Sequence, residues 1–123
     1  MPISGVLPGY PIYLGSKKIV VADLKGLATY TPGGETIKAS QFGQGGIDFV
    51  EPINKQSITV GGAQFIAALS KSGTYYVTIK LASTTPKDAV ASVVITWYVT
   101  ATGLECGALD LHAEEVRVLF VFV

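Results

Sequence analysis

Val116-Arg117-Val118-Leu119-Phe120-Val121-Phe122-Val123 is the stretch that decides the fold of this chain. Its residues are β-branched or aromatic almost throughout, which is typical of a strand. Alternation along a strand places Val116, Val118, Phe120 and Phe122 on one face, and Arg117, Leu119, Val121 and Val123 on the other. Both faces are apolar after Arg117. Because such a strand promotes aggregation at an open sheet edge, we expect both of its faces to be covered, within the subunit or by a neighbour.

The two faces of this strand predict different roles. We expect the face with Phe120 and Phe122 to lie in the core of the subunit. The face with Leu119, Val121 and Val123 is our candidate for contact with another sheet or another subunit. This pattern indicates assembly rather than catalysis.

The rest of the chain reads as short strands separated by glycine and proline. We predict strands over 18–22, 47–50, 74–82 and 90–101, and one helical turn over 38–42 that ends at Gly43. Residues 64–69 fit either a strand or a helical turn. Residues 83–88 are a polar connection, and 103–114 form a long loop with room for a short strand at its centre. This pattern predicts an all-β fold, either a single antiparallel β-sandwich or a jelly-roll-like barrel.

The first sixteen residues differ from the rest of the chain. Residues 1–16 hold three prolines and three glycines, a composition that prefers extended conformations. This segment is either an extended N-terminal arm on a neighbouring subunit or a strap across its own domain, and 17–123 form a single β-domain. Tyr10 and Tyr13 are candidate interface residues in this segment.

The composition narrows the class of protein. The chain has 123 residues, which fits one domain, and 15% of them are charged, against about 25% in an average domain. Nine basic and nine acidic residues give a formal net charge of zero. No basic stripe is present to bind a phosphate backbone, so we expect no nucleic-acid partner. We see no signal peptide and no apolar run of membrane-spanning length, so we expect no membrane association.

Few residues have the chemistry of an active site. A Ser-His-Asp triad could use His112 with Asp110, but no nucleophile-elbow spacing is present, so a loop histidine is favoured. Glu105 would raise the pKa of its neighbour Cys106, which favours a packed cysteine over a reactive one. Metal-ligand pairs at close spacing are missing. We therefore expect no catalytic residues, no cofactor and no metal.

Three aromatic residues lie on the two clearest strands. Trp97 has valine and isoleucine on its own face and is expected in the core. Tyr76 and Tyr98 lie on the opposite faces of their strands. Because exposed tyrosines are enriched at interfaces, we predict that these two contact something outside the domain.

A resemblance adds to this reading. The stretch Thr29 to Gly43 (TYTPGGETIKASQFG), followed by Ile47-Asp48-Phe49-Val50, resembles the small head structural proteins that decorate or cement the capsids of tailed bacteriophages. Val116-Arg117-Val118 is similar to the last strand of those proteins. The resemblance implies a non-enzymatic virion protein on the capsid exterior, assembled in the host cytoplasm. Its partners would be the major capsid protein and itself, as a homo-oligomer with a trimer favoured.

A second class of function stays open. The chain could be a carbohydrate- or receptor-binding β-sandwich of a phage tail or fibre, using Tyr76, Tyr98 or the 103–114 loop. Another structural component of the tail or neck is a further alternative.

Overall fold

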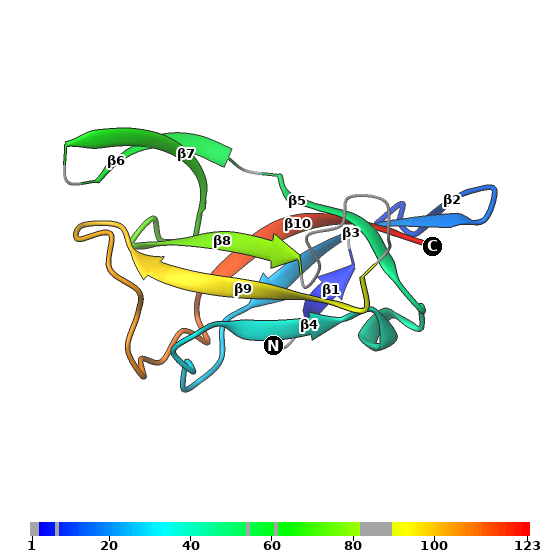
Figure 1. Cartoon of the computed structure of the whole chain (residues 1–123), viewed down its shortest axis with the longest axis horizontal. Helices are drawn as coiled ribbons and strands as arrows, with labels where there is room; N and C mark the ends of the chain where they lie inside the picture. The colour runs from blue at the N-terminus through cyan, green and yellow to red at the C-terminus, as the bar shows by residue number, and fades with distance from the viewer. Residues whose placement is uncertain (1–2, 7, 54, 61, 82–89) are drawn as a thin grey trace.

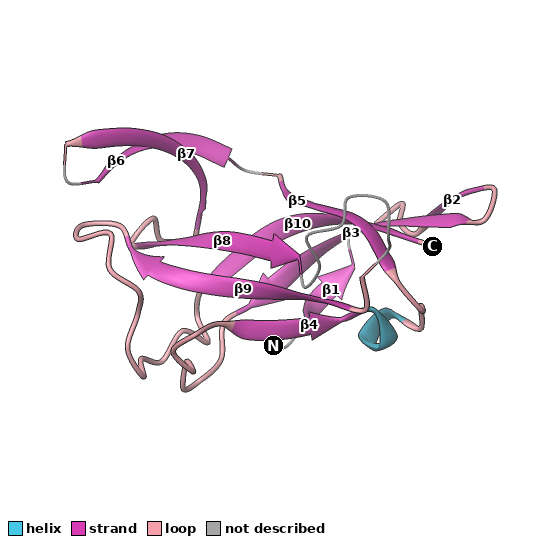
Figure 2. Cartoon of the chain, viewed as in Figure 1, coloured by secondary structure: helices cyan, strands magenta, loops and turns pink. Residues whose placement is uncertain are grey.

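The chain forms two facing antiparallel sheets (Figures 1 and 2). The computed structural model describes residues 3–6, 8–53, 55–60, 62–81 and 90–123. Their strands are β1 (Ile3–Val6), β2 (Ile12–Leu14), β3 (Lys17–Lys25), β4 (Glu35–Lys38), β5 (Ile47–Pro52), β6 (Lys55–Val60), β7 (Ala63–Leu69), β8 (Tyr75–Leu81), β9 (Ser92–Val99) and β10 (Glu115–Phe122), and one 3-10 turn, η1, spans Ala39–Phe42. The prediction of an all-β sandwich is confirmed.

The strands divide between the sheets in a fixed order. Sheet A has the order β1-β3-β10-β5, and β2 also pairs with β3. Sheet B has the order β4-β9-β8-β7-β6. Residues 64–69, which fit either a strand or a helical turn by sequence, belong to strand β7. Strands β4 and β6 were not predicted, because short strands with several polar residues carry a weak hydrophobic pattern.

Strand β10 is the central strand of sheet A, between β3 and β5. Its inward residues are almost completely buried, and they are Val116, Val118, Phe120 and Phe122. They face inward beside Val20, Ala22 and Leu24 of β3, because residues paired across a ladder share a face. The predicted core face of the last strand is therefore correct.

The turn η1 closes one end of the core. Phe42, the last residue of η1, packs its ring on Phe120 and Phe122 with centroid distances of 5.0 and 4.9 Å. Gly43 follows with a φ of 72°, a left-handed conformation that glycine adopts without strain. The helical turn predicted over 38–42 is confirmed, and it serves to place an aromatic ring over the end of β10.

The 103–114 loop contributes to the other end of the core. Leu111 and Cys106 of this loop are buried with Trp97 of β9. A Cβ atom on Gly26 would lie 2.3 Å from the carbonyl oxygen of Leu111, so this close approach requires glycine. The sequence indicated a loop here but did not show that the loop covers the core.

The N-terminal segment is paired with its own domain. Strand β1 pairs with β3 at Ala22, Asp23 and Leu24, and β2 pairs with β3 at Lys17, Lys18 and Ile19. Of the two alternatives for residues 1–16, this pairing favours the strap. Residues 1–2 and 7 of the predicted arm, and the predicted polar connection over 83–88, lie outside the described residues.

The Phe120 side chain gives a direct test of this core. We predict that Phe120→Ala lowers the free energy of unfolding by about 3–5 kcal/mol, because it removes a buried ring and leaves a cavity under Phe42. Urea unfolding followed by circular dichroism measures this loss. Phe49→Ala is the matched control, since Phe49 lies on the exposed face of the same sheet, and it should cost well under half as much. Equal losses for both variants would contradict the assignment of the two faces.

Candidate interaction surface

The outer face of sheet A carries a continuous row of apolar side chains. Ladder partners share a face, so the pairing of Ile12 with Ile19, of Ile19 with Val121, and of Val121 with Phe49 aligns four residues across β2, β3, β10 and β5. We call Ile12, Ile19, Val121 and Phe49 the apolar row. It runs across the full width of one end of the sheet.

The row is accessible from outside the domain. Phe49 is 45% exposed and Ile12 is 42% exposed, while Ile19 and Val121 are half-buried. Figure 1 shows β2 and its turn extending past the body of the sandwich, at the same end as the C-terminus. Leu14 and Val123, on the same face by alternation, are also exposed, and Leu119 beside the row is half-buried. Val21 points outward too but is already buried and adds nothing to the surface.

Ion pairs border this apolar surface. The Lys17 ammonium lies 2.6 Å from a carboxylate oxygen of Asp48 at one end of the face. At the other end, Arg117 binds both carboxylate oxygens of Asp23, at 2.9 and 3.3 Å. Lys55 pairs with Glu51 at the β5 edge. An apolar centre with a polar border is the usual anatomy of a protein–protein interface.

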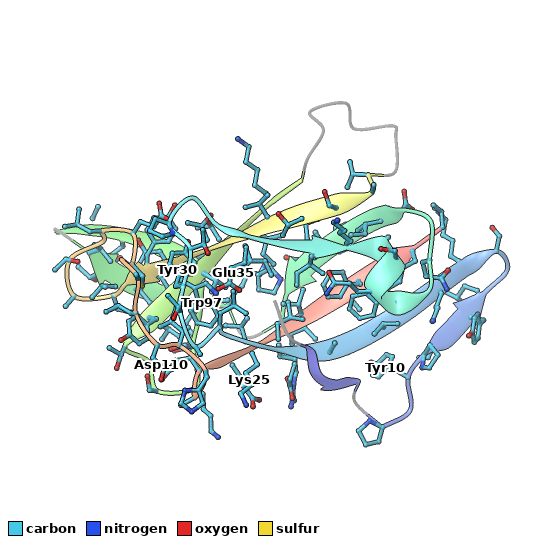
Figure 3. All side chains as sticks on the ribbon, turned by 90° about the horizontal axis from the view of Figure 1, so that it is seen from below. Tyr10, Lys25, Tyr30, Glu35, Trp97 and Asp110 are labelled. Carbon is cyan, nitrogen blue, oxygen red and sulfur yellow. The ribbon has the colours of Figure 1, made fainter. Side chains whose placement is uncertain are left out.

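The predicted interface residues of sheet A and of the N-terminal segment fall into two groups. Leu119, Val121 and Val123 lie on the outer face of sheet A, beside or within the apolar row. Tyr13 is exposed on β2, and Tyr10 is half-buried before this strand, at the far end of the domain from Trp97 (Figure 3). Ile12, Ile19 and Phe49 were missed by sequence reasoning, because their common row exists only once the strands are in register.

The exposure expected for Tyr76 is wrong. Tyr76 and Tyr98 do lie on the outer face of sheet B, where their rings stack at a centroid distance of 5.1 Å. Ile58 and Ala67 of the β6–β7 hairpin cover them, leaving Tyr76 only 5% exposed and Tyr98 half-buried. The hairpin can reach over the sheet because β7 pairs with β8 only at Ala68 and Leu69.

An open depression of about 660 Å³ adjoins the outer face of sheet A. It lies between that face and the start of the β6–β7 hairpin, and Asp23, Arg117, Lys55, Lys71 and Glu115 contribute charges of both signs to its lining. Its volume is within the range of small-molecule sites. Among the described residues that line it none is aromatic.

Comparisons with known proteins identify no relative. No protein-family model, no curated protein and no solved structure matches this chain with significance. Within the described ranges, no helix has the length and apolar character needed to cross a membrane. No group of three or more histidine, cysteine or acidic side chains in the same part of the chain is arranged to hold a metal ion.

The two side chains considered for catalysis, His112 and Cys106, are held by an ion pair and by burial, respectively. His112 Nδ1 lies 2.6 Å from the Asp110 carboxylate on the exposed loop. The backbone N–H of His112 also donates to Asp110, and together these contacts hold the pKa of Asp110 below its ordinary value. Burial, with a further effect of Glu105, raises the pKa of the Cys106 thiol. The prediction of a packed cysteine is confirmed by its burial.

Glu105 joins two loops through Tyr30. The Tyr30 hydroxyl donates to Glu105 Oε2 at 2.9 Å and accepts from the backbone N–H of Trp97 at 3.3 Å. The N–H of Gly33 donates to the same carboxylate oxygen at 2.5 Å. Burial raises the pKa of Tyr30 above its ordinary value, so this phenol stays protonated and keeps its donor role. The arrangement fixes the loop before β4 against the 103–107 segment.

Glu35 is the most unusual titratable residue of the fold. It begins β4 opposite Ile95, on the inner face, and is only 4% exposed. Neither carboxylate oxygen has a hydrogen-bond partner of standard geometry among the described residues, and the same holds for the indole N–H of Trp97. The backbone N–H of Leu27 is near enough to lower the pKa of Glu35 somewhat, but burial has the larger effect. Figure 3 places Glu35 with Tyr30 and Trp97 between the sheets. Burial raises the pKa of Glu35 above its ordinary value of 4.5.

The burial of Glu35 predicts a particular pH dependence of stability. A raised pKa in the folded state means that protonation of Glu35 favours folding. The stability that protonated Glu35 contributes is therefore fully present below pH 4.5, and it is lost as pH rises through the folded-state pKa. We predict that Glu35→Gln is more stable than the wild type at pH 7, and that the difference shrinks toward pH 4. Urea unfolding of both proteins across this range measures it.

Glu114→Gln is a control, because it should change the stability at pH 7 in the opposite direction. Partial burial raises the pKa of Glu114, but hydrogen bonds from Ser70 and Ser72 outweigh it and lower the pKa overall. This substitution should therefore reduce stability at pH 7, with the difference again shrinking toward acid pH. A wild type that gains no stability relative to Glu35→Gln on acidification would contradict the buried-carboxyl assignment.

Proposed function

We propose that this chain is a non-enzymatic structural protein of a virion, which decorates the exterior of a tailed-phage capsid, bridges major capsid subunits and strengthens the shell. The observation that carries the proposal is the apolar row on the outer face of sheet A. A soluble sheet with one face on the core normally presents polar side chains on the other. An apolar outer face is instead typical of a surface that meets another subunit.

The energetics of the row suit an assembly role. Apolar surface contributes about 25 cal/mol for each Å² removed from water, so a contact over several such side chains gains several kcal/mol before the entropy of association is subtracted. The charged side chains at the border already form ion pairs within the chain. Docking another subunit over the row would therefore leave few charges without partners.

The residues of the resemblance are contiguous in the fold. The stretch from Thr29 to Gly43 includes β4 and η1, and Ile47 to Val50 belongs to β5, which pairs with β10. Phe42 of this stretch packs on β10, where Val116-Arg117-Val118 lies. Of the residues in the resemblance, η1, β5 and β10 pack together, while β4 pairs with β9 in sheet B. The similarity to head decoration proteins supports the proposal of a capsid-exterior location, with assembly in the host cytoplasm.

The carbohydrate- or receptor-binding alternative has less support. Sugar sites commonly use an exposed aromatic ring as a stacking surface, but Tyr76 is buried under the β6–β7 hairpin. The open depression favours this alternative, since it has the volume and polar lining of a ligand site. A tail or neck location would be compatible with the same apolar row.

The test is the composition of virus particles. We predict that mass spectrometry of purified particles from the source of this chain detects it in a fixed ratio to the major capsid protein, and that tail-less heads retain it. Cryo-electron microscopy should then show density of 12.9 kDa per copy on the outside of the shell. Heads with the protein removed should lose their contents at lower temperature than complete heads, and adding the purified chain back should restore the difference.

Three outcomes would contradict the proposal in different ways. Absence of the chain from particles would exclude a virion role. Its recovery only in tail or fibre fractions would favour one of the alternatives. Density inside the shell would overturn the decoration role, since that role requires the exterior.

A further inference from the structure

We propose that the ionisation of Glu35 controls the two loops at its end of the sandwich, which pack over the core when this carboxyl is neutral and open to water when it is charged. The loops are residues 26–34, which join β3 to β4, and residues 103–114, which precede β10. We call them the end loops. The inference goes beyond the proposed function and does not rest on it, because the apolar row takes no part in it.

The end loops form one connected cover. Each runs between the two sheets, the first from β3 to β4 and the second from β9 to β10, and Figure 1 shows both at the same end of the sandwich. The N–H of Tyr30 donates to the carbonyl of Leu109 at 2.9 Å, and the N–H of Leu111 donates to the carbonyl of Leu27 at 2.8 Å. The side chains of Tyr30 and Leu111 are buried in the core. Because backbone hydrogen bonds join the loops to each other, we expect them to open together.

Glu35 lies between the sheets beneath this cover. It begins β4 directly after the first end loop, and its pairing with Ile95 makes it a diagonal neighbour of Trp97 on the inner face of sheet B. Figure 3 shows it beside Trp97 and Tyr30. Its side chain is buried, and neither carboxylate oxygen has a hydrogen bond of standard geometry among the described residues. A charged carboxylate in this position lacks most of the hydrogen bonds that water would supply, so its charge favours opening of the end loops.

The groups around Glu35 do not neutralise its charge. In the first end loop, Tyr30 is a neutral phenol, and it interacts electrostatically both with Glu35 and with the like-charged Glu105 of the second loop. The buried residues of β3, β9 and β10 are apolar. The α-amino group of the chain and the N–H of Leu27 lower the pKa of Glu35, but burial has the largest effect and the pKa is raised overall.

Protonation of Glu35 and closure of the end loops are therefore linked. With the loops open, the carboxyl has its ordinary pKa of 4.5, and closure raises this pKa through burial. The closed state is fully favoured below pH 4.5, and this advantage is lost as pH rises through the closed-state pKa. Between these two values the opening equilibrium should rise by about tenfold per pH unit, because opening releases one proton.

Hydrogen exchange of the full chain, followed by NMR from about pH 4 to about pH 8, tests the inference. The probes are the backbone N–H groups of Tyr30 and Leu111 and the indole N–H of Trp97, the only tryptophan. After correction for the intrinsic effect of pH on exchange, their protection should fall severalfold as pH rises. In Glu35→Gln it should stay within about twofold across the same range, because an amide does not ionise.

Three controls separate Glu35 from other sources of pH dependence. His112→Gln removes the histidine of the second end loop and should leave the pH dependence unchanged. Tyr30→Phe removes the hydrogen bond to Glu105, so the loops should open more at every pH with the same pH dependence. Backbone N–H groups of the β6–β7 hairpin report opening away from Glu35, and their protection should not differ in pH dependence between the wild type and Glu35→Gln.

Trp97 fluorescence gives an independent readout. Quenching by acrylamide should increase with pH in the wild type and stay constant in Glu35→Gln, because only an opened loop layer admits the quencher to the buried indole.

Four results would overturn the inference. The first is a wild type whose end loops show no pH dependence of protection or quenching. The second is a pH dependence that persists in Glu35→Gln, and the third is one that His112→Gln abolishes. The fourth is protection of Tyr30 and Leu111 equal to that of Phe120 in the central strand β10 at every pH, since the loops would then open only when the whole domain unfolds.

Discussion

The packing of Phe42 on Phe120 and Phe122 is the interaction on which the rest of this structure depends. It joins the turn η1 to the central strand of sheet A, and it closes the core at that end of the sandwich. Once Phe120 and Phe122 point inward, the two-residue period of a strand turns Leu119 and Val121 outward. One aromatic contact therefore fixes both the core and the face that remains to be covered. A register slip of one residue would exchange the two.

The apolar outer faces of the two sheets differ in whether the chain itself covers them. Sheet B carries the stacked Tyr76 and Tyr98 on its outer face, and the chain covers them itself with the β6–β7 hairpin. Sheet A has an apolar row across four strands that stays exposed at Ile12 and Phe49. This contrast within one small domain is the physical argument for an assembly role. The proposal of an assembly role holds that a partner subunit covers the face that the chain leaves open.

The buried polar groups are concentrated at the opposite end from β2. There Tyr30 and Glu105 join two loops by a hydrogen bond, while Glu35 and the Trp97 indole have no hydrogen bond of standard geometry among the described residues (Figure 3). A buried carboxyl with so little hydrogen bonding is destabilising when it is charged, because the contact with the Leu27 backbone replaces only part of the water that it loses. We interpret Glu35 as a cost to the stability of this end at neutral pH rather than as a catalytic acid, since its carboxylate lies between the sheets.

The sequence by itself determined the all-β class, the helical turn before Gly43 and the inward face of the last strand, because these follow from local periods of two residues or from a single glycine. It also separated Leu119, Val121 and Val123 from the core. Only the tertiary structure decided that the N-terminal residues pair with β3, that a hairpin buries Tyr76, and that Ile12, Ile19 and Phe49 extend the face of Val121 into one row. These facts depend on which strands become neighbours and in what register, and such contacts join residues up to about a hundred positions apart in the chain, beyond the reach of any local pattern.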